Sequence, residues 1–271
     1  MRISPNVSEW LNLLVRWTHV FTGILWIGTT YFFTWLDGRF HEDERAAREG
    51  ERGQVWMVHS GGFYVVEKQK TPGTRELHWF RFEALLTWLS GFVLLVLVYY
   101  MGGGMVDVDV LDISNNVAVA IGIGALVVAW LVYDLLCLSP LGRNEKLFAV
   151  VAFGLSVAAS YGLTRVLSGR AAYIHVGAMF GTIMAANVWM RILPAQRRMI
   201  AATREGSAPD AALAARAKLR SKHNTYMVVP VVFTMISNHF PVATYGREYN
   251  WLILAALILA GWFAAHFIRR A

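Results

Sequence analysis

Long apolar runs alternate with charged segments along most of this chain. Runs of roughly 20 residues have the length that an α-helix needs to cross a bilayer core of about 30 Å. The predicted spans cover residues 17–36, 82–101, 117–138, 147–167, 172–193, 226–240 and 250–268. The pattern therefore predicts an all-α fold, a polytopic transmembrane helical bundle of about seven spans, in which residues 1–271 form a single integral-membrane domain.

The sixth predicted span is shorter than the others. At a rise of 1.5 Å per residue, its roughly 15 apolar residues cover about 22 Å of the bilayer core. Polar residues on both flanks, among them Asn224 and His239, are therefore drawn toward membrane depth, and Pro230 is expected to kink the helix. Polar groups at a short span usually line a cavity, although a locally thinned bilayer is the alternative.

The composition agrees with a membrane protein. Of the 271 residues, 56% are hydrophobic and 16% are charged, whereas an ordinary soluble domain carries about 25% charged residues. The single cysteine, Cys137, excludes an intramolecular disulfide, a Cys-x-x-Cys redox pair and covalent c-type haem in this chain. Any redox centre must use other ligands.

The distribution of basic residues predicts the orientation. The formal net charge is +7, and most Lys and Arg fall in segments 37–81 and 191–225 and at the C-terminal end. The loop with Asp107, Asp109 and Asp112 contains neither Lys nor Arg. The positive-inside rule therefore predicts that segments 37–81 and 191–225 are cytoplasmic, with the N-terminus outside and the C-terminus in the cytoplasm. Because orientation accounts for the charge, no nucleic-acid partner is expected.

Histidines near the ends of predicted spans are candidate haem ligands. His19, His175 and His239 fall near the outer ends and could share one depth, as the ligands of a membrane-embedded haem b must. His78 and His266, near the cytoplasmic ends, are candidates for a second haem. The alternative is structural: histidines also hydrogen-bond between helices, and an interfacial histidine beside a tryptophan is an ordinary anchor.

Charged and amide side chains gather near the predicted cytoplasmic ends. Glu83 and Asp134 fall inside spans, where a carboxylate is costly and marks either a functional site or an ion pair. A further set of donors suits a flat, anionic, carbonyl-rich ligand. Its members are Arg81, Asn187, Arg191, Gln196, Arg197 and Asn224.

Four longer blocks carry a more specific signal. They are HSGGFY from His59, LHWFRFEALLTWLSGF from Leu77, GTIMAANVWMRILPAQR from Gly181 and HNTYMVVPVVFTMISNHFP from His223. In these blocks the chain resembles the bacterial membrane-bound urate oxidases, also called urate hydroxylases, and the resemblance covers essentially the whole chain as the family's N-terminal membrane domain. It departs from the family pattern at Ser60, Ala195 and Phe240, where Gly, Asn and Tyr are expected.

The resemblance implies a haem-dependent oxidation of urate to 5-hydroxyisourate in the bacterial inner membrane. Many family members continue into a cytochrome c domain. This chain has no Cys-x-x-Cys-His, so the expected electron acceptor is a separate periplasmic cytochrome c. The sequence leaves open whether the protein forms a homo-oligomer.

The resemblance also implies roles for individual residues. Urate is expected to bind through Arg81, Asn187, Gln196, Arg197 and Asn224. His59 or Glu83 would accept a proton as water adds to the ring, and the five candidate histidines would hold one or two haem b groups.

Two rival functions remain at this stage. One is a purine or anion transporter without redox activity, in which Glu83 and Asp134 relay protons. The other is a b-type haem protein that acts on quinone or porphyrin.

Overall fold

The computed structural model describes residues 5–46, 53–69, 76–246 and 248–269. The regular structure of the described chain is all helical apart from one β-hairpin, which confirms the all-α part of the predicted fold class. The elements in chain order are α1 (Pro5–Ala46), β1 (Gln54–His59), β2 (Gly62–Glu67), α2 (Phe82–Leu94), η1 (Leu95–Tyr100), α3 (Asn115–Leu138), η2 (Pro140–Arg143), α4 (Glu145–Thr164), α5 (Gly169–Ala186), η3 (Asn187–Ile192), α6 (Leu193–Arg204), α7 (Ala211–Ile236), η4 (Ser237–His239), η5 (Pro241–Ala243) and α8 (Asn250–Ile268).

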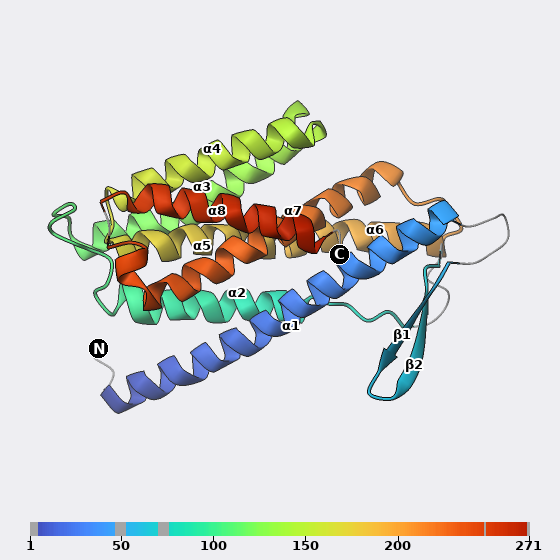
Figure 1. Ribbon diagram of the computed structural model, residues 1–271, viewed down its shortest axis with the longest axis horizontal. Helices are drawn as coiled ribbons and strands as arrows, with labels where there is room; N and C mark the ends of the chain where they lie inside the picture. Colours follow the sequence, from blue (N-terminus) through green and yellow to red (C-terminus); the bar gives the residue numbers. More distant parts are fainter. Residues whose placement is uncertain (1–4, 47–52, 70–75, 247, 270–271) are drawn as a thin grey trace.

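Helix α5 forms the centre of the bundle, with contacts to α2, α3, α4 and α7. It carries the densest set of buried side chains, including Tyr173, His175 and Val176, each at most 1% exposed. Helix α1 instead runs obliquely along the outside, packs mainly on α2, and continues past the end of the bundle (Figure 1). The end of the bundle reached by the last turns of α1, the start of α2 and the start of α7 is called the basic end below, because it carries the two Lys- and Arg-rich segments.

Five helical segments are long and apolar enough to cross a membrane. They are Phe82–Tyr100, Asn115–Leu138, Glu145–Thr164, Gly169–Arg204 and Asn250–Ile268. The predicted span 17–36 lies within α1, and the predicted span 226–240 covers the end of α7 and η4. Both α1 and α7 are too polar to join that group. The number of spans and their orientation therefore stay predictions.

Threonines account for much of the polarity of α1. The hydroxyls of Thr18, Thr22, Thr30 and Thr34 each donate to the carbonyl oxygen four residues earlier, at 2.7–2.9 Å. A hydroxyl satisfied by its own helix exposes no unpaired donor to lipid. The low hydropathy of α1 is therefore compatible with the predicted span.

A turn of π-helix interrupts the long helix that contains α5 and α6. Segment η3 begins at Asn187, and the backbone N–H of Leu193 donates to Val188 O, five residues back. Pro194 follows immediately; it has no N–H and its ring clashes with the carbonyl four residues earlier, so a wider turn relieves the clash. Such π turns often mark functional sites.

Segment 54–67 forms an antiparallel hairpin that the apolar pattern did not predict. Ser60 and Gly61 make its turn with positive φ angles of 49° and 78°. Val55 packs on Leu36 and Phe40 of α1, so the hairpin stands beside α1, away from the other helices (Figure 1).

Candidate functional site

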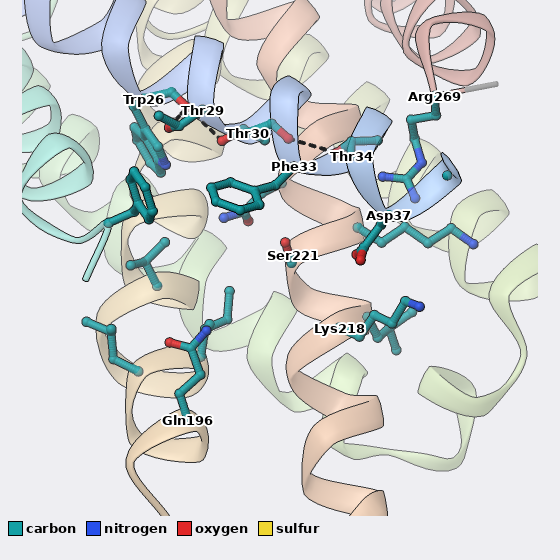
Figure 2. A pocket seen from close by; sticks show the side chains of 18 of the residues that line it. Trp26, Thr29, Thr30, Phe33, Thr34, Asp37, Gln196, Lys218, Ser221 and Arg269 are labelled. Carbon is teal, nitrogen blue, oxygen red and sulfur yellow. Dashed lines mark hydrogen bonds between the residues drawn. The ribbon is translucent and has the colours of Figure 1, made fainter. Parts of the chain in front are cut away.

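A groove of about 830 Å³ opens at the basic end between α1, α6 and α7. Its walls mix aromatic rings with amide, hydroxyl and charged groups, and Figure 2 shows Gln196, Ser221 and Lys218 around the same space. The lining residues used below are Trp26, Phe33, Asp37, His78, Trp79, Glu145, Gln196, Lys218, Lys222, Asn224 and Arg269.

The charges of the groove do not cancel. Lys222 Nζ lies 2.5 Å from Glu145 Oε2, and Lys68 Nζ, outside the groove, lies 3.4 Å from Asp37 Oδ1. Both acidic side chains of the lining therefore have a cationic partner. Lys218 and Arg269 remain as the excess positive charge, which favours an anionic ligand.

Behind the groove, Asp134 of α3 lies at the centre of a buried ion cluster. One carboxylate oxygen of Asp134 accepts from Arg220 Nη2 at 2.7 Å and from Arg191 Nε at 2.9 Å, and Arg191 Nη2 donates to the other oxygen. Arg220 is only 5% exposed, and its guanidinium lies 5.0 Å from the ring centroid of Tyr133. A buried charge needs such partners, because desolvation of an unpaired ion is costly.

Two asparagines join this cluster to the groove. Asn187 Oδ1 accepts from Arg220 at 3.2 Å, and Asn187 Nδ2 donates to Asn224 Oδ1 at 2.9 Å. Asn187 Nδ2 also donates to Tyr133 OH, whose oxygen lies 2.9 Å from His223 Nδ1. The network therefore fixes α3, α5 and α7 relative to one another directly behind the wall that Asn224 contributes.

The structure separates the five predicted urate contacts. Gln196 and Asn224 line the groove, whereas Asn187 is fully buried behind Asn224. Arg197 lines a smaller cavity of about 400 Å³ with Trp79 and Arg204. Arg81 lies over the ring of Phe82 at 4.9 Å and lines neither cavity.

The two predicted proton acceptors do not meet. His59 is exposed at the hairpin turn, while Glu83 lies in the first turn of α2. Neither lines the groove. Glu83 Oε2 is buried, and within the described residues it has no hydrogen-bond partner. Two imidazoles do line the groove, those of His41 and His78, and the ring of His78 contacts Phe80.

The three outer histidines lie in different surroundings. His19 Nδ1 is 2.9 Å from Thr87 O on α2, whereas His175 Nε2 is 3.2 Å from Tyr100 OH at the end of η1. His19 Nδ1 also lies 3.1 Å from Ser90 Oγ. His239 is exposed in η4. The three histidines therefore have different neighbours, and their shared depth stays a prediction.

The packing around these rings tests whether they suit haem. A Cβ added to Gly122 would lie 2.5 Å from His175 Nε2, so α3 fills the side from which iron would approach. An iron–nitrogen bond of about 2 Å needs that space, as does the porphyrin plane. In this packing Nε2 of His175 therefore faces Gly122 of α3, and the role of the histidines as haem ligands stays a prediction.

The inner pair of candidate ligands is also separated by its contacts. His78 lines the groove, while His266 Nδ1 lies 3.2 Å from Tyr226 OH between α8 and α7. No described contact joins the two rings. The second haem, which these two histidines would hold, therefore stays a prediction.

Several residues of the site were missed at the level of sequence. Arg220 and Lys218 are among them: residues 211–222 form the first turns of α7, and Arg220 is buried in the bundle. The sequence feature that could have identified Arg220 is its spacing of four residues from Asn224, which places both side chains on one face of a helix. Asp134, an acidic residue inside a span, also required a cationic partner.

The family of the chain follows from its match to known sequences. One family profile, urate oxidase N-terminal, matches residues 5–271. The chain belongs to the urate oxidase N-terminal family. No curated protein and no solved structure matches it. Membership in the urate oxidase N-terminal family confirms the resemblance found in the four sequence blocks and indicates an enzyme with a urate-related function.

Proposed function

We propose that the chain oxidises urate to 5-hydroxyisourate in the bacterial inner membrane and that urate binds in the groove at the basic end. The family match supports the substrate. The observation that carries the location is the excess positive charge of Lys218 and Arg269 in a groove of about 830 Å³, a volume typical of small-molecule sites. Urate is a flat monoanion near neutral pH, and such a groove attracts it.

Each side of the groove has a separate role in this proposal. The rings of Trp26, Phe33 and Trp79 offer apolar faces to the flat substrate. Gln196 and Asn224 offer amide groups to its carbonyls and ring nitrogens. Asn187 acts as a positioning residue, because it is buried and holds Asn224 by a hydrogen bond of 2.9 Å.

The reaction requires an electron acceptor. Urate and one water molecule give 5-hydroxyisourate, two protons and two electrons, and two molecules of ferricytochrome c would each accept one electron. His78, one of the two imidazoles that line the groove, is the proposed acceptor of a proton as water adds. A separate cytochrome c is the proposed electron acceptor, and haem b, held by histidines of the bundle, is the proposed carrier of electrons toward it.

The proposal is tested with the purified full chain in nanodiscs, supplied with urate and ferricytochrome c. We expect urate loss and reduction of two cytochrome molecules per urate consumed. Uptake of urate into sealed vesicles without any redox change would overturn the proposal in favour of transport. Cytochrome reduction that occurs only with quinol or porphyrinogen would overturn it in favour of another donor.

Replacing Arg269 with Gln is expected to raise the KM for urate about tenfold and leave kcat nearly unchanged. A hydrogen bond to a charged group contributes about 1.5–3 kcal/mol, and 1.4 kcal/mol corresponds to a factor of ten; the lower value applies because the groove is open to solvent. The readout is steady-state urate kinetics at low and high salt, because salt should raise the wild-type KM more than the variant KM.

Arg165→Gln is the matched control for Arg269→Gln. Arg165 is exposed at the end of α4, where its guanidinium lies 5.1 Å from the Tyr161 ring centroid, and it does not line the groove. The same loss of one positive charge there should leave KM unchanged. An equal rise in both variants would mean that only the overall charge matters.

A further inference from the structure

The hairpin presents one face that is apolar in its two pairs nearest the turn and that no described residue covers. Strand pairing sets Trp56 opposite Val65 and Val58 opposite Phe63, and directly opposed residues share a face. These four side chains are 67%, 47%, 69% and 81% exposed, in that order. An apolar face of this kind, with its side chains in contiguous pairs, marks an interaction surface.

The opposite face of the hairpin already has its partner. Val55 is 6% exposed and packs on Leu36 and Phe40 of α1, with Met57 and Val66 beside it. A two-stranded hairpin is only marginally stable by itself. Helix α1 therefore supplies one side of the support and fixes which face points outward.

The position of the hairpin along α1 sets its depth in the membrane. Phe33 of α1 contacts Phe80 with ring centroids 5.1 Å apart, and Phe80 precedes the span Phe82–Tyr100 by two residues. Leu36 and Phe40, on which the hairpin rests, lie three and seven residues beyond Phe33. That is about 5–10 Å along the helix, which matches a headgroup layer of roughly 5–8 Å on each side of the hydrocarbon core.

The surroundings of the hairpin favour lipid over another protein segment. Figure 1 shows the hairpin beside the C-terminal end of α1, with the other helices on the opposite side of α1. The adjoining surface of α1 is also apolar and exposed, with Phe32 at 43% and Trp35 at 37%. Rings of Trp, Tyr and Phe at this level are typical of the membrane interface.

We propose that the hairpin is a membrane anchor, in which Trp56, Val58, Phe63 and Val65 insert into the boundary between headgroups and acyl chains at the basic end. The open end of the hairpin, with Gln54 and Glu67 hydrogen-bonded at 2.5 Å, stays with the headgroups and water. The anchor fixes the basic end of α1, which forms one wall of the groove, against the bilayer surface. This proposal is independent of the activity.

The test measures how deep single spin labels lie in the membrane. In a Cys137→Ser background, the full chain carries Val58→Cys or Phe63→Cys and is reconstituted in phospholipid nanodiscs. The matched control is Ala208→Cys, an exposed position between α6 and α7 at the same end of the bundle. Relaxation by oxygen, which partitions into lipid, is compared with relaxation by a water-soluble nickel chelate.

The expected result is an oxygen-to-nickel ratio several-fold higher at positions 58 and 63 than at position 208. Nickel access at positions 58 and 63 equal to that at position 208 would overturn the proposal and place this face in water. Protection from both reagents, with dipolar coupling between labels on two chains, would also overturn it, because a second copy would then cover the face. Two label positions guard against a local disturbance by either substitution.

Discussion

Replacing Asp134 with Asn is expected to lower the free energy of unfolding by about 3 kcal/mol. Loss of one partner of a buried ion pair costs about 3–5 kcal/mol, because the remaining charge is left without compensation. Here that charge is Arg220, at 5% exposure. The lower figure applies because the amide oxygen of Asn still accepts a hydrogen bond from Arg220, and because Arg191, whose side chain is 41% exposed, can turn toward solvent. Unfolding by SDS in mixed micelles measures the loss.

Glu145→Gln is the control for this prediction, because it also neutralises a carboxylate in an ion pair. Glu145 pairs with Lys222, but its side chain is 58% exposed, so a change of at most about 1 kcal/mol is expected. A second comparison is the double variant Asp134→Leu with Arg220→Met, which removes both charges and should be more stable than Asp134→Leu alone. If Asp134→Asn and Glu145→Gln cost the same, the cluster around Asp134 is not buried as described.

Replacing Gly177 with Ala is expected to destabilise the bundle by about 1–3 kcal/mol, the usual effect of overpacking. An added Cβ would overlap Thr234 Oγ1 and lie 2.9 Å from Thr234 Cβ on α7. Thr234 is fully buried and cannot turn away, so the two helices must separate. Because Asn187 lies on the continuation of α5 and Asn224 lies on α7, the same change should also raise the KM for urate.

Gly181→Ala provides the matched control one turn further along α5. Nothing lies within 4 Å of a Cβ added there, so the substitution should be neutral or should stabilise the helix by up to about 1 kcal/mol. Thermal unfolding measures the stability of both variants, and urate kinetics measure their KM. Equal behaviour of the two variants would contradict the close contact between α5 and α7 at Gly177.

The sequence predicted the helices that are apolar throughout and was less informative about the others. The runs that became α3, α4 and α8 are visible because nearly every residue in them is apolar. Helix α1 was also predicted, yet its threonines lower its hydropathy, and only the structure shows that their hydroxyls bond within the helix. The hairpin was missed because its outward face, with Trp56 and Phe63, is as apolar as its inward face, so the strands show no alternation.

The candidate site was predicted only in part, because residue type is visible in the sequence and tertiary contacts are not. Gln196 and Asn224 were identified from residue type near the end of a span, and both line the groove. The ion cluster joins residues 134, 191 and 220, which are far apart in sequence and meet only through tertiary packing. His19 and His175 fall at similar places within their runs, but only tertiary packing shows that each ring has a different neighbour.

The π turn at Asn187–Ile192 places one extra residue in an otherwise continuous helix. The side chains after the turn are therefore rotated about the helix axis relative to those before it. Each residue of an α-helix turns the chain by about 100°. Deleting one residue within the turn would keep every groove side chain in the sequence, yet rotate Gln196 by that angle away from its present position. Substitutions in this stretch should therefore be tolerated far more readily than single-residue deletions.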